Sequence, residues 1–208
     1  MSVLLICFGE RYHMTSSQIE ELFIMRRSIR RFQQIPLPIE DLRKCINCAR
    51  MAPSGKNLQP LEYILVTEKN IREQLFQYLH WAGYLPSFNP SIKEQPMGYI
   101  IVLVDKKSSD VILTAYDVGI ALAHIVLYAE FKNIGSCILK NIDVQRIQEL
   151  LQVPDSFAVD SVVALGYKDE NPVPENDYKN KKYWLDEVQI MHVPKRPLSS
   201  VLHEQTFS

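Results

Sequence analysis

The spacing of apolar positions predicts five helices. In each region apolar side chains recur every three or four residues, and a serine, aspartate or proline stands near the start of most of them. The predicted helices span residues 18–25, 38–49, 70–79, 110–131 and 143–151. The long segment from Ser109 or Asp110 to Phe131 is apolar almost all round. Because a one-sided surface helix would show a polar face, this segment is expected to lie centrally or in a subunit interface.

Four short runs rich in β-branched and apolar residues predict strands. They cover residues 61–67, 99–104, 135–139 and 161–167. The run at 99–104 is continuous, which is typical of a strand buried on both faces. Strands do not alternate strictly with helices along the chain, so the pattern favours the α+β class over a doubly wound sheet. We expect a central mixed sheet of four to five strands flanked by helices.

Three regions lack a usable period. Residues 81–96 are rich in aromatic residues, proline, serine and asparagine and predict an irregular surface loop, of a length that often carries function. Residues 171–194 are polar, contain several prolines and are aperiodic, and the tail from Pro197 holds a short helix or wraps a neighbour. Residues 1–16 are interpreted as an N-terminal leader to the first helix, since their apolar run is too short for a signal peptide.

Length and composition favour one domain over residues 1–208. The chain has 208 residues, 47% of them hydrophobic and 23% charged, which is ordinary for a globular protein. The longest apolar stretch, 118–129, contains His124 and falls short of the roughly 20 residues of a membrane span. The four cysteines of the whole chain are too few for a secreted disulfide scaffold. A soluble, cytoplasmic protein with no membrane partner is therefore expected.

The net charge of the chain restricts the classes of binding partner that are expected. The formal charge of −1 argues against a general polyanion binder, so no nucleic-acid partner is expected and any anion site is local. The chain has no Gly-rich dinucleotide turn, complete phosphate loop, nucleophile elbow or metal-binding helix motif. The five histidines show no ligand spacing with one another or with cysteine, so no metal site is expected.

Cys45 and Cys48 form a lone C-x-x-C pair within a predicted helix. One interpretation is a redox dithiol, which predicts that Cys45→Ser abolishes activity. The other is a pair of buried, inert thiols. The mid-helix position favours the second, because a redox dithiol normally sits at a helix N-terminus, where the helix dipole lowers the thiol pKa.

A cluster of arginines is the first strong chemical feature. Arg26, Arg27, Arg30 and Arg31 fall within six positions, and residues 22–39 contain no acid. Such charges repel one another unless solvent or an anion compensates them. A solvated face is the simpler alternative. Ser28 lies between the arginine pairs and offers a hydroxyl to the same oxyanion, so the pattern favours a phosphorylated ligand.

Two motifs carry a family resemblance. They are Arg26–Phe32 (RRSIRRF) and Ala52–Pro60 (APSGKNLQP), and the segments DVG, IGSC and KRPL follow at 117–119, 134–137 and 195–198. In this order and spacing they resemble the FMN-dependent nitroreductase family over about Gln18 to His203. The resemblance implies an α+β, intertwined homodimer that holds FMN at its interface with residues from both subunits. It also implies that the C-terminal extension, residues 171–208, wraps the partner subunit.

The resemblance implies roles for twelve residues. Arg26, Arg27 and Ser28 match positions that hold the FMN phosphate and ribityl chain. Arg30 matches the basic position near the flavin pyrimidine edge, where a cation would stabilise the reduced ring. The other implied FMN-binding residues are Pro53, Ser54, Gly55, Asn57, Leu139, Lys140, Lys195 and Arg196.

These remaining residues form three groups. The loop 53–57 approaches the ring from the other subunit, and Lys195 or Arg196 completes the phosphate site. A main-chain N–H that bonds flavin N5 comes from Leu139, Lys140 or Asn141. A glycine commonly lies beside this N–H in the family, and here Asn141, which tolerates a left-handed backbone, is the nearest substitute.

The resemblance implies a ping-pong oxidoreductase. NADH or NADPH gives hydride to flavin N5, and a nitroaromatic, quinone or similar small-molecule acceptor then takes electrons at the same face. No catalytic side chain is required, because the cofactor carries the chemistry. Two alternatives stay open: a flavin-binding protein without turnover, such as a reservoir or sensor, and a reductive dehalogenase or flavin-fragmenting enzyme on the same fold.

Overall fold

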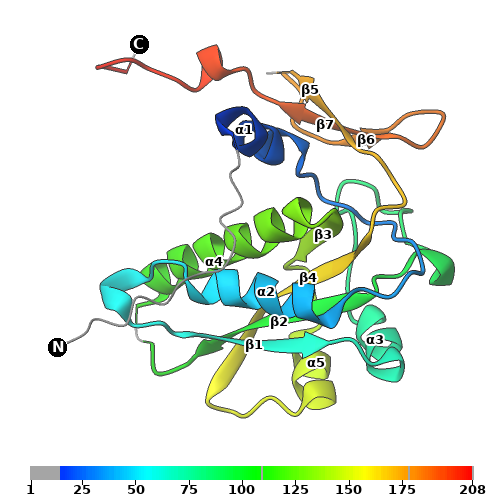
Figure 1. The fold of residues 1–208 in the computed structure, drawn as a ribbon, viewed down its shortest axis with the longest axis vertical. Coiled ribbons are helices and arrows are strands. Elements are labelled where there is room, and N and C mark those ends of the chain that lie inside the picture. Colours follow the sequence, from blue (N-terminus) through cyan, green and yellow to red (C-terminus); the bar gives the residue numbers. More distant parts are fainter. Residues whose placement is uncertain (1–14, 109, 178, 208) are drawn as a thin grey trace.

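A four-stranded antiparallel sheet forms the centre of the molecule. The computed structural model describes residues 15–108, 110–177 and 179–207; most of the predicted leader, including Cys7, lies outside them. The strand order is β1-β2-β4-β3, with β1 at Leu61–Val66, β2 at Gly98–Asp105, β4 at Phe157–Tyr167 and β3 at Ile134–Leu139 (Figure 1). All four predicted strands are confirmed. β4 begins at Phe157, earlier than the predicted 161, because residues 157–159 pair with the end of β2 beyond a register shift at Val102/Leu103.

Both faces of the sheet are covered by helices. α2 (Ile39–Arg50) and α4 (Val111–Phe131) lie on one face, and α3 (Lys69–Phe76) and α5 (Val144–Leu151) on the other, while α1 (Ser16–Met25) lies against α4 (Figure 1). Alternate residues of β2 enter two separate apolar clusters, with Ile100 and Val102 facing α4 and Ile101 and Leu103 on the opposite side. This two-sided burial confirms the interpretation of the continuous apolar run.

Side-chain caps fix the helix starts. Thr15 and Gln18 form a capping box at α1, and the carboxylates of Asp110 and Asp143 accept backbone N–H groups at the starts of α4 and α5. Each cap satisfies a backbone donor that has no partner within its helix. The five predicted helices are therefore confirmed, with ends that differ by a few residues.

α4 is long and apolar enough to cross a membrane by length and composition alone. In the molecule it packs against α2 and β3, and it buries Asp117 and Glu130 along with its apolar residues. That packing is typical of the core helix of a globular domain and matches the central position predicted from the sequence.

The arginine-rich segment that follows α1 adds an irregular strip to the sheet. Ile29 N–H donates to Ser136 O and Gln33 N–H donates to Tyr167 O, both at 2.9 Å. Ser28 pairs with Ser136 in a parallel bridge, whereas the pairings between the four main strands are antiparallel. The mixed character expected of the sheet is thus limited to this bridge.

Two glycines let the arginine-rich segment lie this close to the sheet. A Cβ on Gly166 would stand 2.7 Å from Phe32 Cδ1, and a Cβ on Gly135 would stand 3.0 Å from Ile29 Cγ1. Cβ atoms essentially never come closer than 3.0 Å to another atom, so a side chain at Gly166 would push Phe32 away, and one at Gly135 would crowd Ile29.

The C-terminal region corrects the prediction of an aperiodic segment. Residues 171–194 contain most of a second, three-stranded sheet with the order β5-β7-β6, formed by Val173–Asn176, Met191–Lys195 and Trp184–Leu185. These strands are too short to show a period of two. Pro194 is tolerated in the central strand because β6 pairs only with Met191 and His192.

Short 3₁₀ turns occupy the remaining regions. They are η1 at Gly55–Asn57, η2 at Ile92–Glu94 and η3 at Leu198–Ser200. Residues 81–96 are otherwise irregular, as predicted, and η3 is the short helix that was one alternative for the tail.

Candidate functional site

Arg26 and Arg27 lie directly after α1, where the chain turns toward β3. Arg27 is 9% exposed, and its NH2 group donates to Ile24 O. Its Nε atom is buried and has no hydrogen-bond partner. A guanidinium is rarely buried with a donor unpaired, so this atom lacks an acceptor that a ligand could supply.

The fold brings Lys195 to these two arginines. Lys195 ends β7, and its pKa is lowered by partial burial of the ammonium group and by the positive charges of Arg27 and Arg26. Burial and the charge of Arg26 also lower the pKa of Arg27, against a smaller raising effect from Glu130. Three cations from distant parts of the sequence thus repel one another at one place. A bound anion would relieve that repulsion.

Arg196 points elsewhere. Its Nε donates to Ser200 Oγ at 3.2 Å, and its NH2 group donates to Ser200 O, so the guanidinium is engaged with the chain's own tail. Of the two basic residues at the end of β7, Lys195 is therefore the one whose charge acts on Arg26 and Arg27.

Arg30 lies farther along the same segment. Its NH1 group donates to Ser28 O at 3.3 Å, and its guanidinium stacks on the ring of Tyr183, 4.9 Å from the centroid. The hydroxyl of Tyr183 accepts the N–H of Tyr84 at 3.2 Å. Tyr183 therefore links Arg30 to the loop 81–96. Sequence reasoning missed this residue because it lies in the aperiodic region 171–194.

The loop 81–96 is also held by the arginine-rich segment itself. Phe32 N–H donates to Glu94 O at 3.0 Å, and Arg31 forms an ion pair with Glu94 at 3.4 Å. The Arg31 guanidinium also lies over the ring of Phe88, at 5.3 Å. The loop is thus part of the surroundings of the basic cluster, which its sequence alone did not indicate.

The open edge of β3 continues from the arginine-rich segment. Ser136 O faces Ile29, away from β4, and alternate residues of an antiparallel strand share one direction, so Ile138 and then Lys140 present their backbone groups outward. Leu139 is buried and its backbone faces β4. This favours Lys140 over Leu139 as a main-chain donor at the edge.

Lys140 also borders a hollow of about 480 Å³ between β2, α4 and β4. Its ammonium group donates to the backbone oxygen of Asp160 at 2.9 Å and forms an ion pair with that residue's carboxylate. The side chain of Lys140 is therefore directed toward β4, while its backbone remains at the edge of β3.

The second motif forms a tight loop at the other end of α4. Gly55 N–H donates to Asp117 Oδ1 at 2.8 Å, and Gln59 N–H donates to Ser54 Oγ at 3.0 Å. Asn57 has a φ of 55°, in the left-handed region that asparagine tolerates well. Pro53 is exposed and lines a small hollow of about 140 Å³ beside Ser54 and Asp117.

Within one chain the two motifs do not meet. The loop is bonded to Asp117, whereas Arg27 is affected by the charge of Glu130, thirteen residues later on α4. At 1.5 Å per residue that separation is about 20 Å along the helix. The structure therefore gathers Arg26, Arg27, Ser28, Arg30 and Lys195 at one place, and leaves the loop 53–57 at another.

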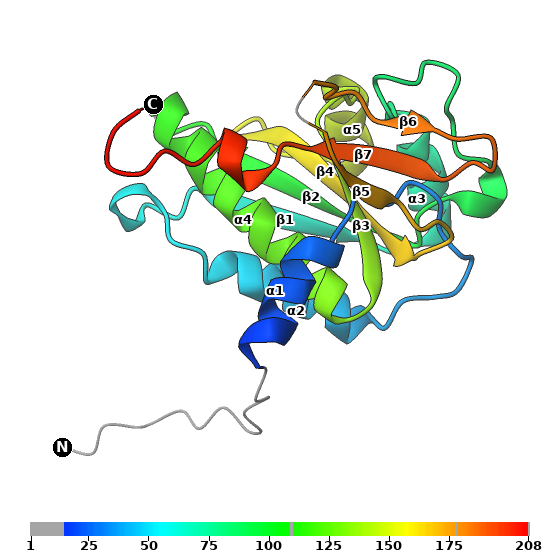
Figure 2. The same ribbon diagram turned by 90° about the horizontal axis from the view of Figure 1, so that it is seen from above.

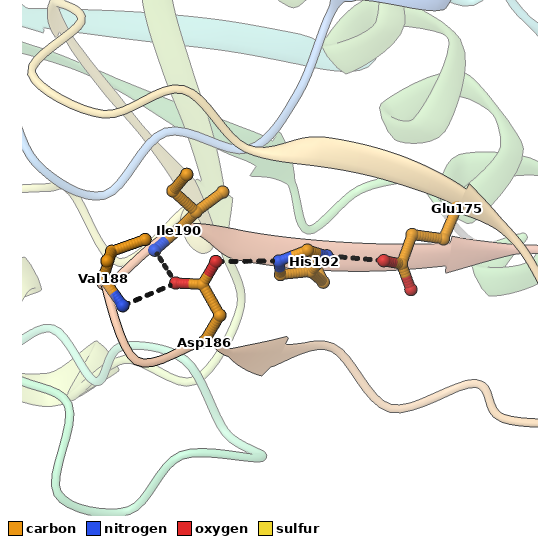
Figure 3. Close-up of polar contacts among 5 residues, drawn as sticks. All are labelled: Glu175, Asp186, Val188, Ile190 and His192. Carbon is orange, nitrogen blue, oxygen red and sulfur yellow. Dashed lines mark hydrogen bonds and ion pairs between the residues drawn. The ribbon is translucent and has the colours of Figure 1, made fainter.

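His192 joins the strands of the second sheet. Its Nδ1 lies 2.5 Å from Glu175 Oε1 on β5, and its Nε2 lies 3.2 Å from Asp186 Oδ2 after β6 (Figure 3). The ring also stacks on Trp184, with centroids 4.1 Å apart. The hydrogen bonds to Asp186 and Glu175 raise the pKa of His192. Because β7 carries both His192 and Lys195, this cluster helps to fix the position of Lys195.

The two thiols of the C-x-x-C pair are not activated. Burial, with smaller effects from Cys48 and Asp41, raises the pKa of Cys45 to about 12, and burial also raises the pKa of Cys48. A reactive cysteine needs a lowered pKa, so the geometry favours the inert interpretation.

Three segments at one side of the molecule carry exposed apolar side chains. α1, α4 and the C-terminal segment lie together on that side (Figure 2). Large hydrophobic side chains are exposed on all three: Ile19, Phe23, Ile24 and Met25 on α1; Val111, Ile112 and Tyr116 on α4; and Leu198, Val201, Leu202 and Phe207 in the C-terminal segment. Apolar surface of this extent is typical of a protein interface.

The fold is of the α+β class, and the basic cluster is a candidate site for a phosphorylated ligand. Comparison with known proteins is specific about the family: the model of the Nitroreductase family matches residues 24–167. The chain therefore belongs to the Nitroreductase family. The C-terminal sheet lies beyond the matched residues.

Individual similar proteins and solved structures are consistent with membership of this family. The chain is 26% identical to the NADPH-flavin oxidoreductase of Vibrio harveyi over 81% of this chain and 77% of the relative. It is 26% identical to the iodotyrosine deiodinase of Thermotoga neapolitana, over 72% and 88%. The structure of an FMN-dependent nitroreductase from Clostridium difficile R20291 superposes with a TM-score of 0.67 at 26% identity, covering 89% of this chain and 98% of that one.

Proposed function

We propose that this protein is an FMN-dependent NAD(P)H oxidoreductase that reduces a nitroaromatic, a quinone or a related small acceptor. The single observation that carries the proposal is the set of cations formed by Arg26, Arg27 and Lys195, together with the buried, unpaired Nε of Arg27. Family membership and the similarity to flavin-dependent oxidoreductases support the same conclusion.

The residues present fit FMN. A phosphate would give Arg27 Nε its missing acceptor and offset the repulsion between the three cations. Hydrogen bonds of this charge-assisted kind are worth about 1.5–3 kcal/mol each. Ser28 would add a hydroxyl donor, while Arg196 would have to leave Ser200 to take part.

Bound FMN would supply the electron-transfer chemistry between a nicotinamide and an acceptor. The chain's own contribution is charge and orientation. Arg30 would place a cation at the pyrimidine edge, where it stabilises negative charge without any rearrangement at the moment of reaction. The outward backbone N–H of Lys140 would hold the ring edge against β3.

A second copy of the chain is part of the proposal. The loop 53–57 lies about 20 Å along α4 from the basic cluster, so a site that uses both motifs needs two chains. The exposed apolar side chains of α1, α4 and residues 198–207 supply a surface for that association. In the resulting homodimer, Pro53, Ser54, Gly55 and Asn57 of one chain would face the flavin of the other.

We also propose that the protein is located in the cytoplasm, which is a reducing compartment. Among the described residues, Cys45, Cys48 and Cys137 are free thiols. Free buried thiols are usual where disulfides do not persist.

Anaerobic absorbance spectroscopy tests the function. The purified protein is loaded with FMN, desalted, and titrated with NADH and then with NADPH. A retained two-band flavin spectrum that bleaches supports the oxidoreductase. Retained flavin that does not bleach would identify a flavin-binding protein without turnover, and failure to retain FMN would overturn the proposal.

A reductive dehalogenase is the second candidate. The observation in its favour is the similarity to the Thermotoga deiodinase, which extends over 88% of that protein. Iodide release from 3-iodotyrosine, measured with the chemically reduced FMN protein, decides between the candidates. Release that is faster than nitroaromatic or quinone reduction would favour the dehalogenase.

A further inference from the structure

Glu170 is a partly buried acid beside the arginine-rich segment. It lies just beyond the end of β4, and its Oε1 accepts the backbone N–H of Arg30. Its Oε2 is buried and has no hydrogen-bond partner. In residues 22–39 the sequence has no acid, so Glu170 supplies from 140 residues away a negative charge that the segment itself lacks.

The surroundings of Glu170 are mostly cationic. The positive charges of Arg30 and Arg31 lower the pKa of Glu170, and hydrogen bonds from the backbone N–H groups of both residues lower it as well. Burial of the carboxyl group raises the pKa of Glu170 and is the largest effect, so the pKa is raised overall even though both arginines lower it. Cys137 on β3 is also close enough to sense this carboxyl.

Joining the two segments does not by itself require a charged residue at this position. A carboxyl with one buried, unpaired oxygen costs free energy, and the nearby charges of Arg30 and Arg31 offset only part of that cost, since the pKa of Glu170 is raised overall. Asp169, the neighbouring residue, already joins the two segments through its backbone N–H, which donates to Arg31 O at 3.0 Å. The charge of Glu170 therefore acts on the electrostatics of the arginine-rich segment, beyond holding the main chain in place.

We propose that Glu170 is a positioning residue of the flavin site: it holds the main chain at Arg30 and sets the net charge that surrounds Arg30 beside the flavin. The inference rests on the proposed function, since bound FMN is the group that senses this charge. Reduction makes the flavin more negative, so a nearby carboxylate opposes it and a nearby guanidinium favours it. Glu170 thus keeps the reduction potential of the bound flavin lower than the arginines alone would set it.

Glu170→Gln separates charge from hydrogen bonding. The amide oxygen of glutamine can still accept the Arg30 N–H, but the negative charge is gone. The midpoint potential of bound FMN, measured by anaerobic equilibration with a reference dye, is expected to rise. The Kd of FMN is expected to change by less than about threefold, since the hydrogen bond remains.

Two further variants serve as controls. Asp169→Asn removes a negative charge from the exposed side chain of the neighbouring residue. The midpoint potential of FMN in this variant should equal that of the wild type. Glu170→Asp keeps the charge but shortens the side chain, so the potential should stay low while FMN binds about tenfold more weakly. This variant also keeps the test open if Glu170→Gln does not fold.

The outcomes are distinct. An unchanged potential in Glu170→Gln, or an equal rise in Asp169→Asn, would overturn the role of Glu170 while leaving the proposed function intact. A wild-type protein that retains no FMN would overturn both. A rise confined to Glu170→Gln would support the inference.

Discussion

The backbone N–H of Gly55 donates to the carboxylate of Asp117 at 2.8 Å, and this bond fixes the second sequence motif to the central helix. Asp117 is 6% exposed and lies in the first half of α4. The bond gives a buried carboxylate a partner and gives the loop 53–57 a fixed position. The loop can then present Pro53, Ser54 and Asn57 at the molecular surface.

Asp117→Ala is expected to destabilise the protein and loosen this loop. Loss of the acceptor leaves the Gly55 N–H without its partner, at a cost of about 1.5–3 kcal/mol in the free energy of unfolding. Asp117→Asn keeps an oxygen that can accept the bond and should cost less. Denaturant unfolding and amide exchange at Gly55 measure the two effects, with Asp155→Ala, at an exposed acid, as the control. Unchanged exchange at Gly55 in Asp117→Ala would contradict the assignment.

Gly166→Ala is expected to displace the arginine-rich segment. The new Cβ would stand 2.7 Å from Phe32 Cδ1 and 2.8 Å from Phe32 Cβ. Overpacking of this kind costs about 1–3 kcal/mol and should also weaken FMN binding. Gly83→Ala, where nothing lies within 4 Å of the added Cβ, is the matched control. Thermal unfolding and FMN titration of both variants test the prediction, and equal behaviour of the two would refute it.

Arg27→Gln is expected to separate stability from ligand binding. The substitution removes a buried cation that Arg26 and Lys195 repel, so the ligand-free protein should be as stable as the wild type or more stable. Loss of one charge-assisted bond should weaken FMN binding by about 10- to 100-fold. Arg43→Gln, at an exposed arginine paired with Glu40, should leave FMN binding unchanged. A ligand-free Arg27→Gln protein that unfolds more easily would show that Arg27 is structural instead.

His192 is expected to make stability depend on pH. Its pKa is raised in the folded protein by Asp186 and then by Glu175, so its contribution is complete below the unfolded value of about 6.5. The contribution is lost as the pH rises through the higher folded value. The melting temperature of the wild type relative to His192→Gln should therefore fall as the pH rises above about 6.5, through the raised pKa of the folded protein. His80→Gln serves as the control, and a constant difference for His192→Gln would rule the effect out.

Cys45 is expected to stay unmodified in the folded protein. Its pKa of about 12 leaves almost no thiolate at neutral pH, and the side chain is buried. Iodoacetamide labelling followed by mass spectrometry should modify Cys45 only after unfolding. Rapid labelling of the native protein, or loss of NAD(P)H turnover in Cys45→Ser, would restore the dithiol interpretation.

Local signals made most of the fold predictable. The apolar period and the capping residues located the five helices, and the continuous apolar runs located the four main strands. The second sheet was not predictable, because strands of two to five residues show no clear alternation and two of them contain proline. Their pairing depends on contacts such as those of His192, which have no local signature.

The candidate site was predictable only in part. The acid-free run containing Arg26 and Arg27 indicated an anion site by itself, because repulsion between neighbouring residues follows from sequence order. Glu170 and Tyr183 act on Arg30 from 140 residues or more away, and no local pattern connects them with it. An acid-free basic segment does imply a compensating acid somewhere, but only the folded chain shows which one it is.

The distance along α4 between the loop 53–57 and the basic cluster has a genetic consequence. In the proposed homodimer, a chain damaged only in the loop and a chain damaged only at Arg27 would complement each other. Each heterodimer would contain one site with both halves intact, although neither homodimer is active. Co-expression of two inactive variants would then restore activity, and two variants damaged in the same half would not.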